Sequence, residues 1–161
     1  MSESLHRELK ELIYDPFHEK VQQIYADFKK QGHRHVFHLD AHSMPSVGTQ
    51  MHRDPGEKRA DVVVSDSLGK SCHPHFRDLV ISAYVIAGFK VGYNWPYIGG
   101  RLTEQYGRPE NGQQTIQVEL NRDLYMDEKT KKLKSSHLEV QNKIAKVLSY
   151  IQSELPNINI R

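Results

Sequence analysis

The stretch ADVVVSD, residues 60–66, holds the plainest strand pattern in the sequence, and the predicted fold is built around it. Its three consecutive valines form an apolar run without polar alternation, which is typical of a strand covered on both faces. Ser65 and Asp66 end the run, and glycine and lysine follow soon after. A strand of this kind needs packed layers on either side, so the stretch favours a layered α/β domain.

Helical and strand patterns alternate on both sides of this stretch. Residues 14–32 predict a helix with Asp15 as its N-cap and Gly32 as its stop. The other predicted elements are strands at 35–40, 89–94 and 115–122, a helix at 74–87, and a last helix that opens with a capping box of Ser136 and Glu139. We therefore expect one α/β domain over residues 1–161, with a layered mixed or parallel sheet flanked by helices.

The composition excludes several classes of function. The chain has 161 residues, a formal net charge of +2 and a single cysteine, Cys72. Its only dense basic run, residues 128–134, has no interleaved aromatic side chains on which nucleic-acid bases could stack. The sequence also lacks a signal-peptide core and a membrane-spanning apolar stretch. We expect a cytoplasmic protein that binds neither nucleic acid nor membranes.

Polar side chains follow three of the predicted strands at the points where they end. Asp40 and His42 close the first strand, Asn94 closes the third, and Glu119 and Arg122 lie near the end of the last. Residues i and i+2 of a strand point to the same side, so Asp40 and His42 should leave their strand together. Ligands of open α/β sheets bind at the carboxyl ends of strands, so we expect these side chains to converge.

These residues could form a hydrolytic site. Amide hydrolysis needs a metal or another electrophile, a base for water, and donors that hold negative charge. His42 is the candidate metal ligand, Glu119 the candidate base, and Arg101 and Arg122 the candidate donors.

Each candidate also has a structural explanation. A histidine at a strand end is often a surface residue, and Asp40 could cap a turn or orient His42. Glu119 alternates with apolar neighbours, which is also the pattern of a solvent-exposed strand face. Asn94 could be a turn residue. Arg101 could form a local ion pair with Glu104, and Arg122 could form one with Asp123 or Asp127.

Several segments together resemble the N-formylglutamate amidohydrolases. They are, in order, YDPFHEKV, LDAHSMPS, ADVVVSDSLGKSC, GYNWPYIGGRLTEQYGRP and TIQVELNRDLYMDE, and they cover about residues 14–128. The resemblance implies a fold similar to that of zinc carboxypeptidases and aspartoacylases. It also implies hydrolysis of N-formylglutamate to formate and glutamate, a step of histidine catabolism, with a small acidic N-acyl amino acid as the partner.

The resemblance assigns roles residue by residue. It implies that His42 is a zinc ligand with Asp40 beside it, and that Glu119 is the general base. Asn94, Arg101 and Arg122 are then the groups that receive the substrate carboxylates or the developing oxyanion.

The front of the sequence departs from the family pattern. Family members begin with a further segment that ends a strand in a Pro-His-Ser-Gly-like motif, and we expect the other zinc ligands there. We therefore expect a fold incomplete at its N-terminus and a zinc ion that this chain alone holds incompletely. A homodimer or a complementing N-terminal chain could complete the site. The alternatives are a site built from internal histidines (His33, His35, His38, His73 and His75) or a non-catalytic relative that binds an acidic amino acid.

Overall fold

The computed structural model describes residues 2–160 of the chain. These residues form two compact units, which divide between Val36 and Phe37. The first unit is helical, and the second holds nearly all of the sheet. Among residues 2–160, none of the helices combines the length and the apolar character that crossing a bilayer requires.

The first unit is a continuous helical segment of three parts. They are α1 (Glu3–Leu9), a π-helical turn (Lys10–Tyr14) and α2 (Asp15–Lys30). The helix ends as predicted, with Gly32 at φ +88°.

The predicted start of this helix at Asp15 is wrong. The N-cap is Ser2, whose side chain accepts a hydrogen bond from the Leu5 N–H at 3.3 Å. Asp15 lies inside the helix, where Lys10 Nζ contacts its carboxylate at 2.6 Å. The π-helical turn ends at Tyr14, two residues before Pro16, and it explains the continuity, because a local change of helical pitch accommodates a proline that has no N–H to donate.

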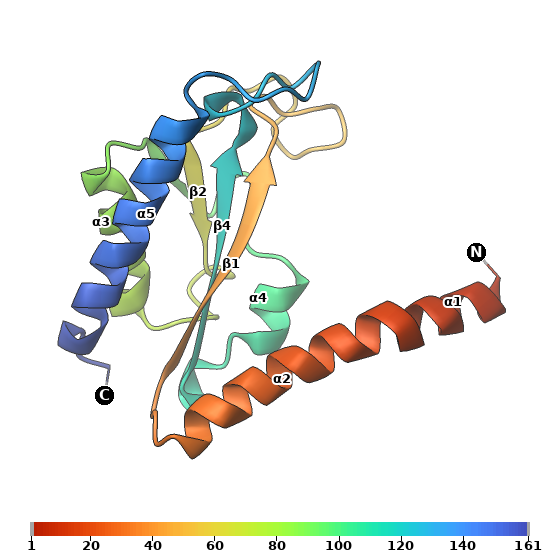
Figure 1. Cartoon of the computed structure of the whole chain (residues 1–161), viewed down its shortest axis with the longest axis vertical. Helices are drawn as coiled ribbons and strands as arrows, with labels where there is room; N and C mark the ends of the chain where they lie inside the picture. The colour runs from red at the N-terminus through yellow and green to blue at the C-terminus, as the bar shows by residue number, and fades with distance from the viewer. Residues whose placement is uncertain (1, 161) are drawn as a thin grey trace. The chain divides into compact units, whose positions relative to one another are not determined.

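The second unit contains a mixed sheet of four strands in the order β1-β4-β2-β3. The strands are β1 (Val36–Met44), β2 (Val62–Ser65), β3 (Val91–Tyr93) and β4 (Gln113–Asn121). β2 is parallel to β3 and antiparallel to β4, and the arrows of β4 and β1 point the same way in Figure 1. The predicted α/β class is confirmed, and strand direction divides the sheet into two pairs whose carboxyl ends lie at opposite ends.

Helices α3 (Pro74–Ile86) and α5 (His137–Glu154) pack on one face of the sheet (Figure 1). Phe76 of α3 and Val147 of α5 are almost fully buried in this layer. Their packing partners on the strands include Val62, Val64, Ile116 and Val118. The core therefore lies between these two helices and one face of the sheet.

Two local predictions differ from the structure. The hydroxyl of Ser136 donates to the Leu124 carbonyl at 2.7 Å and does not cap α5, so the predicted capping box is wrong. A short helix, α4 (Arg101–Tyr106), lies within a segment that sequence reasoning treats as a loop. Its six residues are too few to establish a helical period.

Candidate functional site

A row of polar side chains covers the sheet face opposite the core. Phe37 and Leu39 of β1 pack against the core, so His38, Asp40 and His42 alternate to the other face. β4 behaves in the same way, with Ile116 and Val118 in the core and Gln117 and Glu119 opposite. Because β1 and β4 are neighbours in the sheet, the two polar rows lie next to each other.

Glu119 is the most unusual residue of this face. It is only 7% exposed, and its carboxylate accepts a hydrogen bond from Gln117 Nε2 at 2.9 Å. Burial raises the pKa of Glu119 and the charge of Asp40 adds to the rise, whereas His42 and Arg59 oppose it. A buried carboxylate with a raised pKa is suited to accepting a proton. The solvent-exposed alternative for Glu119 is therefore wrong.

Asp40 and His42 contact each other, as their spacing predicts. Asp40 Oδ1 lies 3.0 Å from His42 Nε2. The Asp40 side chain is 8% exposed and that of His42 is 48% exposed, so the aspartate is the covered member of the pair. Asp40 therefore orients the His42 ring.

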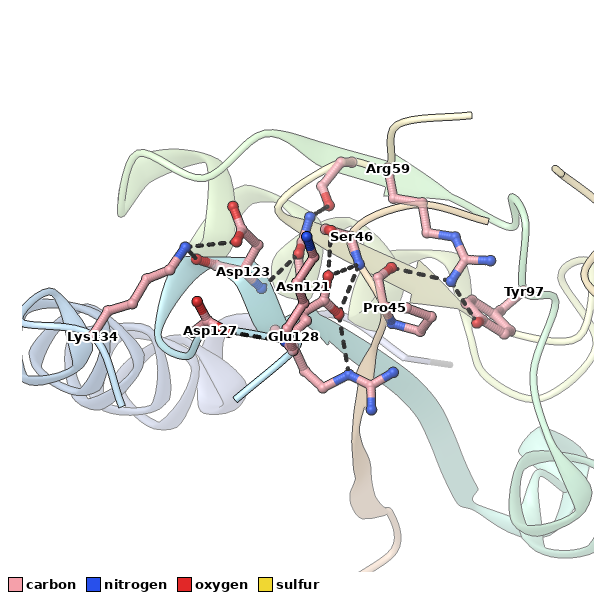
Figure 2. A network of polar contacts seen from close by, with 12 residues as sticks. Pro45, Ser46, Arg59, Tyr97, Asn121, Asp123, Asp127, Glu128 and Lys134 are labelled. Carbon is pink, nitrogen blue, oxygen red and sulfur yellow. Dashed lines mark hydrogen bonds and ion pairs between the residues drawn. The ribbon is translucent and has the colours of Figure 1, made fainter. Parts of the chain in front are cut away.

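Arg59 is a buried cation near this face that sequence reasoning misses. Its guanidinium contacts the Asp54 carboxylate through two hydrogen bonds of 2.7 Å, and both side chains are 1% exposed. A third nitrogen, Nη1, donates to the Tyr97 hydroxyl at 2.8 Å and to the Pro45 carbonyl at 3.2 Å (Figure 2). The Arg59 bonds hold the pKa of Asp54 below its usual range. A single arginine in a polar loop has no local pattern that would reveal these partners.

The segment that follows β1 is held from two sides. Arg59 binds the Pro45 carbonyl, and the Ser46 N–H donates to both carboxylate oxygens of Glu128 at 3.1 and 3.2 Å (Figure 2). The Ser46 hydroxyl also donates to this carboxylate. These bonds fix the end of the strand that carries His42.

The other predicted site residues lie in different surroundings. Asn94 Nδ2 donates a hydrogen bond to Asp66 Oδ1 at 2.9 Å, and Asn94 Oδ1 accepts one from the Asp66 backbone N–H at 3.1 Å. Arg101 is 94% exposed and lies 3.5 Å from Glu104. Arg122 Nε lies 3.6 Å from Glu128 Oε1, which is neither of its two expected partners.

The expected convergence of three strand ends is wrong. β2 and β3 run opposite to β4, so Asn94, which follows β3, lies level with Gln117 in the middle of β4, with β2 between them, and not at the carboxyl end of β4. The structure instead gathers Asp40, His42 and Glu119 along neighbouring strands.

The zinc ion that the resemblance implies does not fit the residues present. A catalytic zinc ion generally takes three protein ligands. Within residues 2–160, no group of three or more His, Cys, Asp and Glu side chains is arranged to hold a metal ion. The internal histidines therefore do not complete a site around His42.

Comparisons with known proteins agree with the fold. A crystal structure of N-formylglutamate amidohydrolase from Ralstonia eutropha matches with a TM-score of 0.80 and 26% identity, over 96% of this chain and 56% of that one. A gene product of Agrobacterium tumefaciens shares the fold, with a TM-score of 0.61 and 19% identity over 94% of this chain and 57% of that one. The chain thus spans a little over half the length of either protein.

The sequence comparisons point the same way. No curated protein sequence matches this chain significantly. The family model for N-formylglutamate amidohydrolase matches residues 1–126, which is most of the chain and includes Asp40, His42 and Glu119. The chain belongs to the N-formylglutamate amidohydrolase family.

Proposed function

We propose that this protein acts in the hydrolysis of N-formyl-L-glutamate to formate and L-glutamate, with Glu119 as the general base. The observation that carries the proposal is the state of Glu119 itself: a carboxylate buried on the polar face of the sheet, with a raised pKa. Membership of the family supports the reaction class.

The proposed chemistry uses the residues of the polar face. Glu119 takes a proton from the attacking water as a C–O bond forms at the formyl carbon. It then returns the proton to the nitrogen as the C–N bond breaks, so the proton count balances. A raised pKa makes the carboxylate a stronger base than a solvated glutamate. Gln117 holds the carboxylate in place by its hydrogen bond.

Arg122 is the proposed receiver of a substrate carboxylate. Its Nε is buried and has no hydrogen-bond partner in the described part of the chain, and Glu128 lies 3.6 Å away. An arginine with an unused donor is suited to binding a carboxylate. Arg101, which is almost fully exposed, and Asn94 are secondary candidates for the same role.

The decisive experiment is release of formate from N-formyl-L-glutamate by the purified chain, with and without added zinc. We expect turnover in at least one condition and its loss in Glu119→Gln, which removes the base and keeps the shape. Glu110→Gln is the matched control, because Glu110 is exposed. Equal rates in wild type and Glu119→Gln would contradict the assignment of the base.

A second function is favoured by the incomplete metal-ligand set. A relative without a three-ligand site would bind an acidic amino acid and not turn over its N-formyl derivative. Calorimetry with L-glutamate then gives binding that is indifferent to chelators and weakened in Arg101→Ala. Binding that disappears with a chelator would exclude this alternative.

Metal content separates the two functions further. We expect the dialysed chain to retain far less than one zinc ion per molecule, and the same amount in His42→Ala, because among residues 2–160 His42 belongs to no group of three or more possible metal ligands. Elemental analysis measures both. One zinc ion per chain, lost in His42→Ala, would show that His42 belongs to a complete site.

A further inference from the structure

The first unit carries an apolar face along its whole helix. Residues 3–30 form one continuous helix (Figure 1). Seven apolar residues recur along it at steps of three to five positions, and we call them the apolar stripe: Leu5, Leu9, Leu12, Phe17, Val21, Ile24 and Phe28. Six of the seven are between 40% and 70% exposed, and Val21 is partly buried. Helices in proteins gain most of their stability when such a face packs against a partner.

The π-helical turn keeps the apolar stripe on one side of the helix. At about 3.6 residues per turn, an uninterrupted α-helix would rotate Phe17 by about a third of a turn away from Leu5. A π-helical turn takes in about one extra residue, which corresponds to a little over a quarter of a turn. The turn at Lys10–Tyr14 therefore brings Phe17 back to the side of the helix that carries Leu5 and Leu9.

The apolar stripe has almost the same spacing in both directions. From Leu5 the next two members follow after four and then three positions, and from Phe28 backward they follow at the same steps. In an antiparallel pair whose two-fold axis crosses the middle of residues 3–30, Leu5 lies opposite Phe28. Leu9 then lies opposite Ile24. Steps of four and three are the spacing of a coiled-coil seam, so two copies of the stripe fit each other in antiparallel orientation.

The charges of the first unit are divided between its two halves. Residues 2–19 carry five acidic and two basic side chains, a net charge of −3, whereas residues 20–36 carry one acidic and four basic side chains, a net charge of +3. An antiparallel pair places each negative half beside a positive half, whereas a parallel pair would place like charges together. The same division disfavours an anionic membrane surface, because it would repel the negative half. The charges therefore select a second copy of the helix as the partner.

We propose that the apolar stripe binds the same stripe of a second copy of this chain, with the two helices antiparallel. Pairing removes the apolar side chains of both copies from water. It also brings Glu3 of one copy near Lys30 of the other, at each end of the paired helices. This inference is independent of the proposed hydrolysis, and its test does not use activity.

The first test is sedimentation equilibrium of the full chain over a range of concentrations. We expect a monomer–dimer equilibrium without larger species, because a two-fold interface is closed. Ile24→Lys places a charge in the seam from both copies, so the dissociation constant of the dimer should rise about a hundredfold. Gln22→Lys is the matched control: it adds the same charge at an exposed position outside the stripe and should leave the dissociation constant unchanged. Leu9→Gln is the second disruptive variant, and circular dichroism checks that each variant keeps its helices.

The second test determines the orientation of the two helices. Glu3→Lys combined with Glu8→Lys changes the net charge of residues 2–19 from −3 to +1, which should weaken an antiparallel dimer and strengthen a parallel one. Lys29→Glu combined with Lys30→Glu makes the other half negative and should also weaken the antiparallel dimer. All four substitutions together should restore it at low ionic strength, because the two halves are again opposite in charge.

Four outcomes would overturn the proposal or part of it. A monomer at every concentration would show that the stripe does not bind a second copy. A dimer equally stable in Ile24→Lys and Gln22→Lys would place the interface elsewhere. Co-sedimentation with phosphatidylcholine vesicles at concentrations where the chain is monomeric would make the stripe a lipid-binding surface. A dimer strengthened by the reversal of Glu3 and Glu8 would overturn the antiparallel orientation.

Discussion

On β4, Ile116 and Val118 face the helices α3 and α5, whereas Gln117 and Glu119 face the opposite side of the sheet, and all four are at most 7% exposed. Burial alone therefore does not separate the core from the candidate site. The apolar pair is stabilised by packing. The polar pair retains an ionisable carboxyl at an energetic cost, visible in its raised pKa. A buried group with a perturbed pKa makes that face a candidate functional site.

The largest expected effect is a loss of stability when a buried side chain is removed from the core face of the sheet. Phe76 is 0% exposed, and its ring centroid lies 4.8 Å from that of Phe37. Phe76→Ala should lower the free energy of unfolding by about 4 kcal/mol, because it leaves a cavity between α3 and the sheet. Urea unfolding followed by circular dichroism measures the loss. Val85→Ala on the same helix is the control, since Val85 is 54% exposed, and a similar loss there would contradict the position of the core.

The next effect concerns the buried ion pair near the polar face. Arg59→Met leaves Asp54 buried without its partner and should cost about 3 kcal/mol of stability. Arg59→Met combined with Asp54→Leu should recover most of this loss, because the cost comes from the uncompensated charge. Urea unfolding of the two variants tests this, and equal losses in both would show that Arg59 acts through packing.

The same pair predicts a pH dependence with a definite sign. The pKa of Asp54 is held below its ordinary value in the fold, chiefly by the hydrogen bonds from Arg59. Its contribution to stability is therefore present above the unfolded pKa of about 3.9 and is lost as the pH falls through the folded value. This acid-side loss should be smaller in Arg59→Met.

A smaller effect tests the polar face directly. The pKa of Glu119 is raised in the fold by burial, so the folded chain keeps its proton to higher pH than the unfolded chain. Wild type should lose stability as the pH rises from the ordinary value of 4.5 through the folded pKa, and Glu119→Gln should not. Urea midpoints across this pH range measure the difference. A difference that stays constant with pH would mean that Glu119 is solvated, as Glu110 is.

The smallest effect is expected at Arg101. It is 94% exposed and its ion pair with Glu104 spans 3.5 Å, so Arg101→Ala should leave the urea midpoint unchanged. Comparison with Arg59→Met distinguishes an arginine that stabilises the fold from one whose side chain is available to bind a ligand. A measurable drop in the midpoint of Arg101→Ala would remove that contrast.

Local patterns predicted much of the fold and part of the site. Three valines in a row identified β2, and apolar residues at helical spacing identified α3. The i, i+2 spacing predicted that Asp40 and His42 lie together. Patterns failed where an element was short, as in α4, or where a helix continued through a proline, as at Pro16.

By itself, the sequence determined the continuous apolar run of β2, the alternation of β4, the contact between Asp40 and His42, and the resemblance to one family. Only the tertiary structure decided that Glu119 is buried near that pair and that Arg59 binds Asp54, Tyr97 and Pro45. It also decided that Asn94 lies level with the middle of β4 and not at its carboxyl end. The reason is physical: side-chain alternation is a local property, whereas the order and direction of strands depend on pairing between segments far apart in the chain.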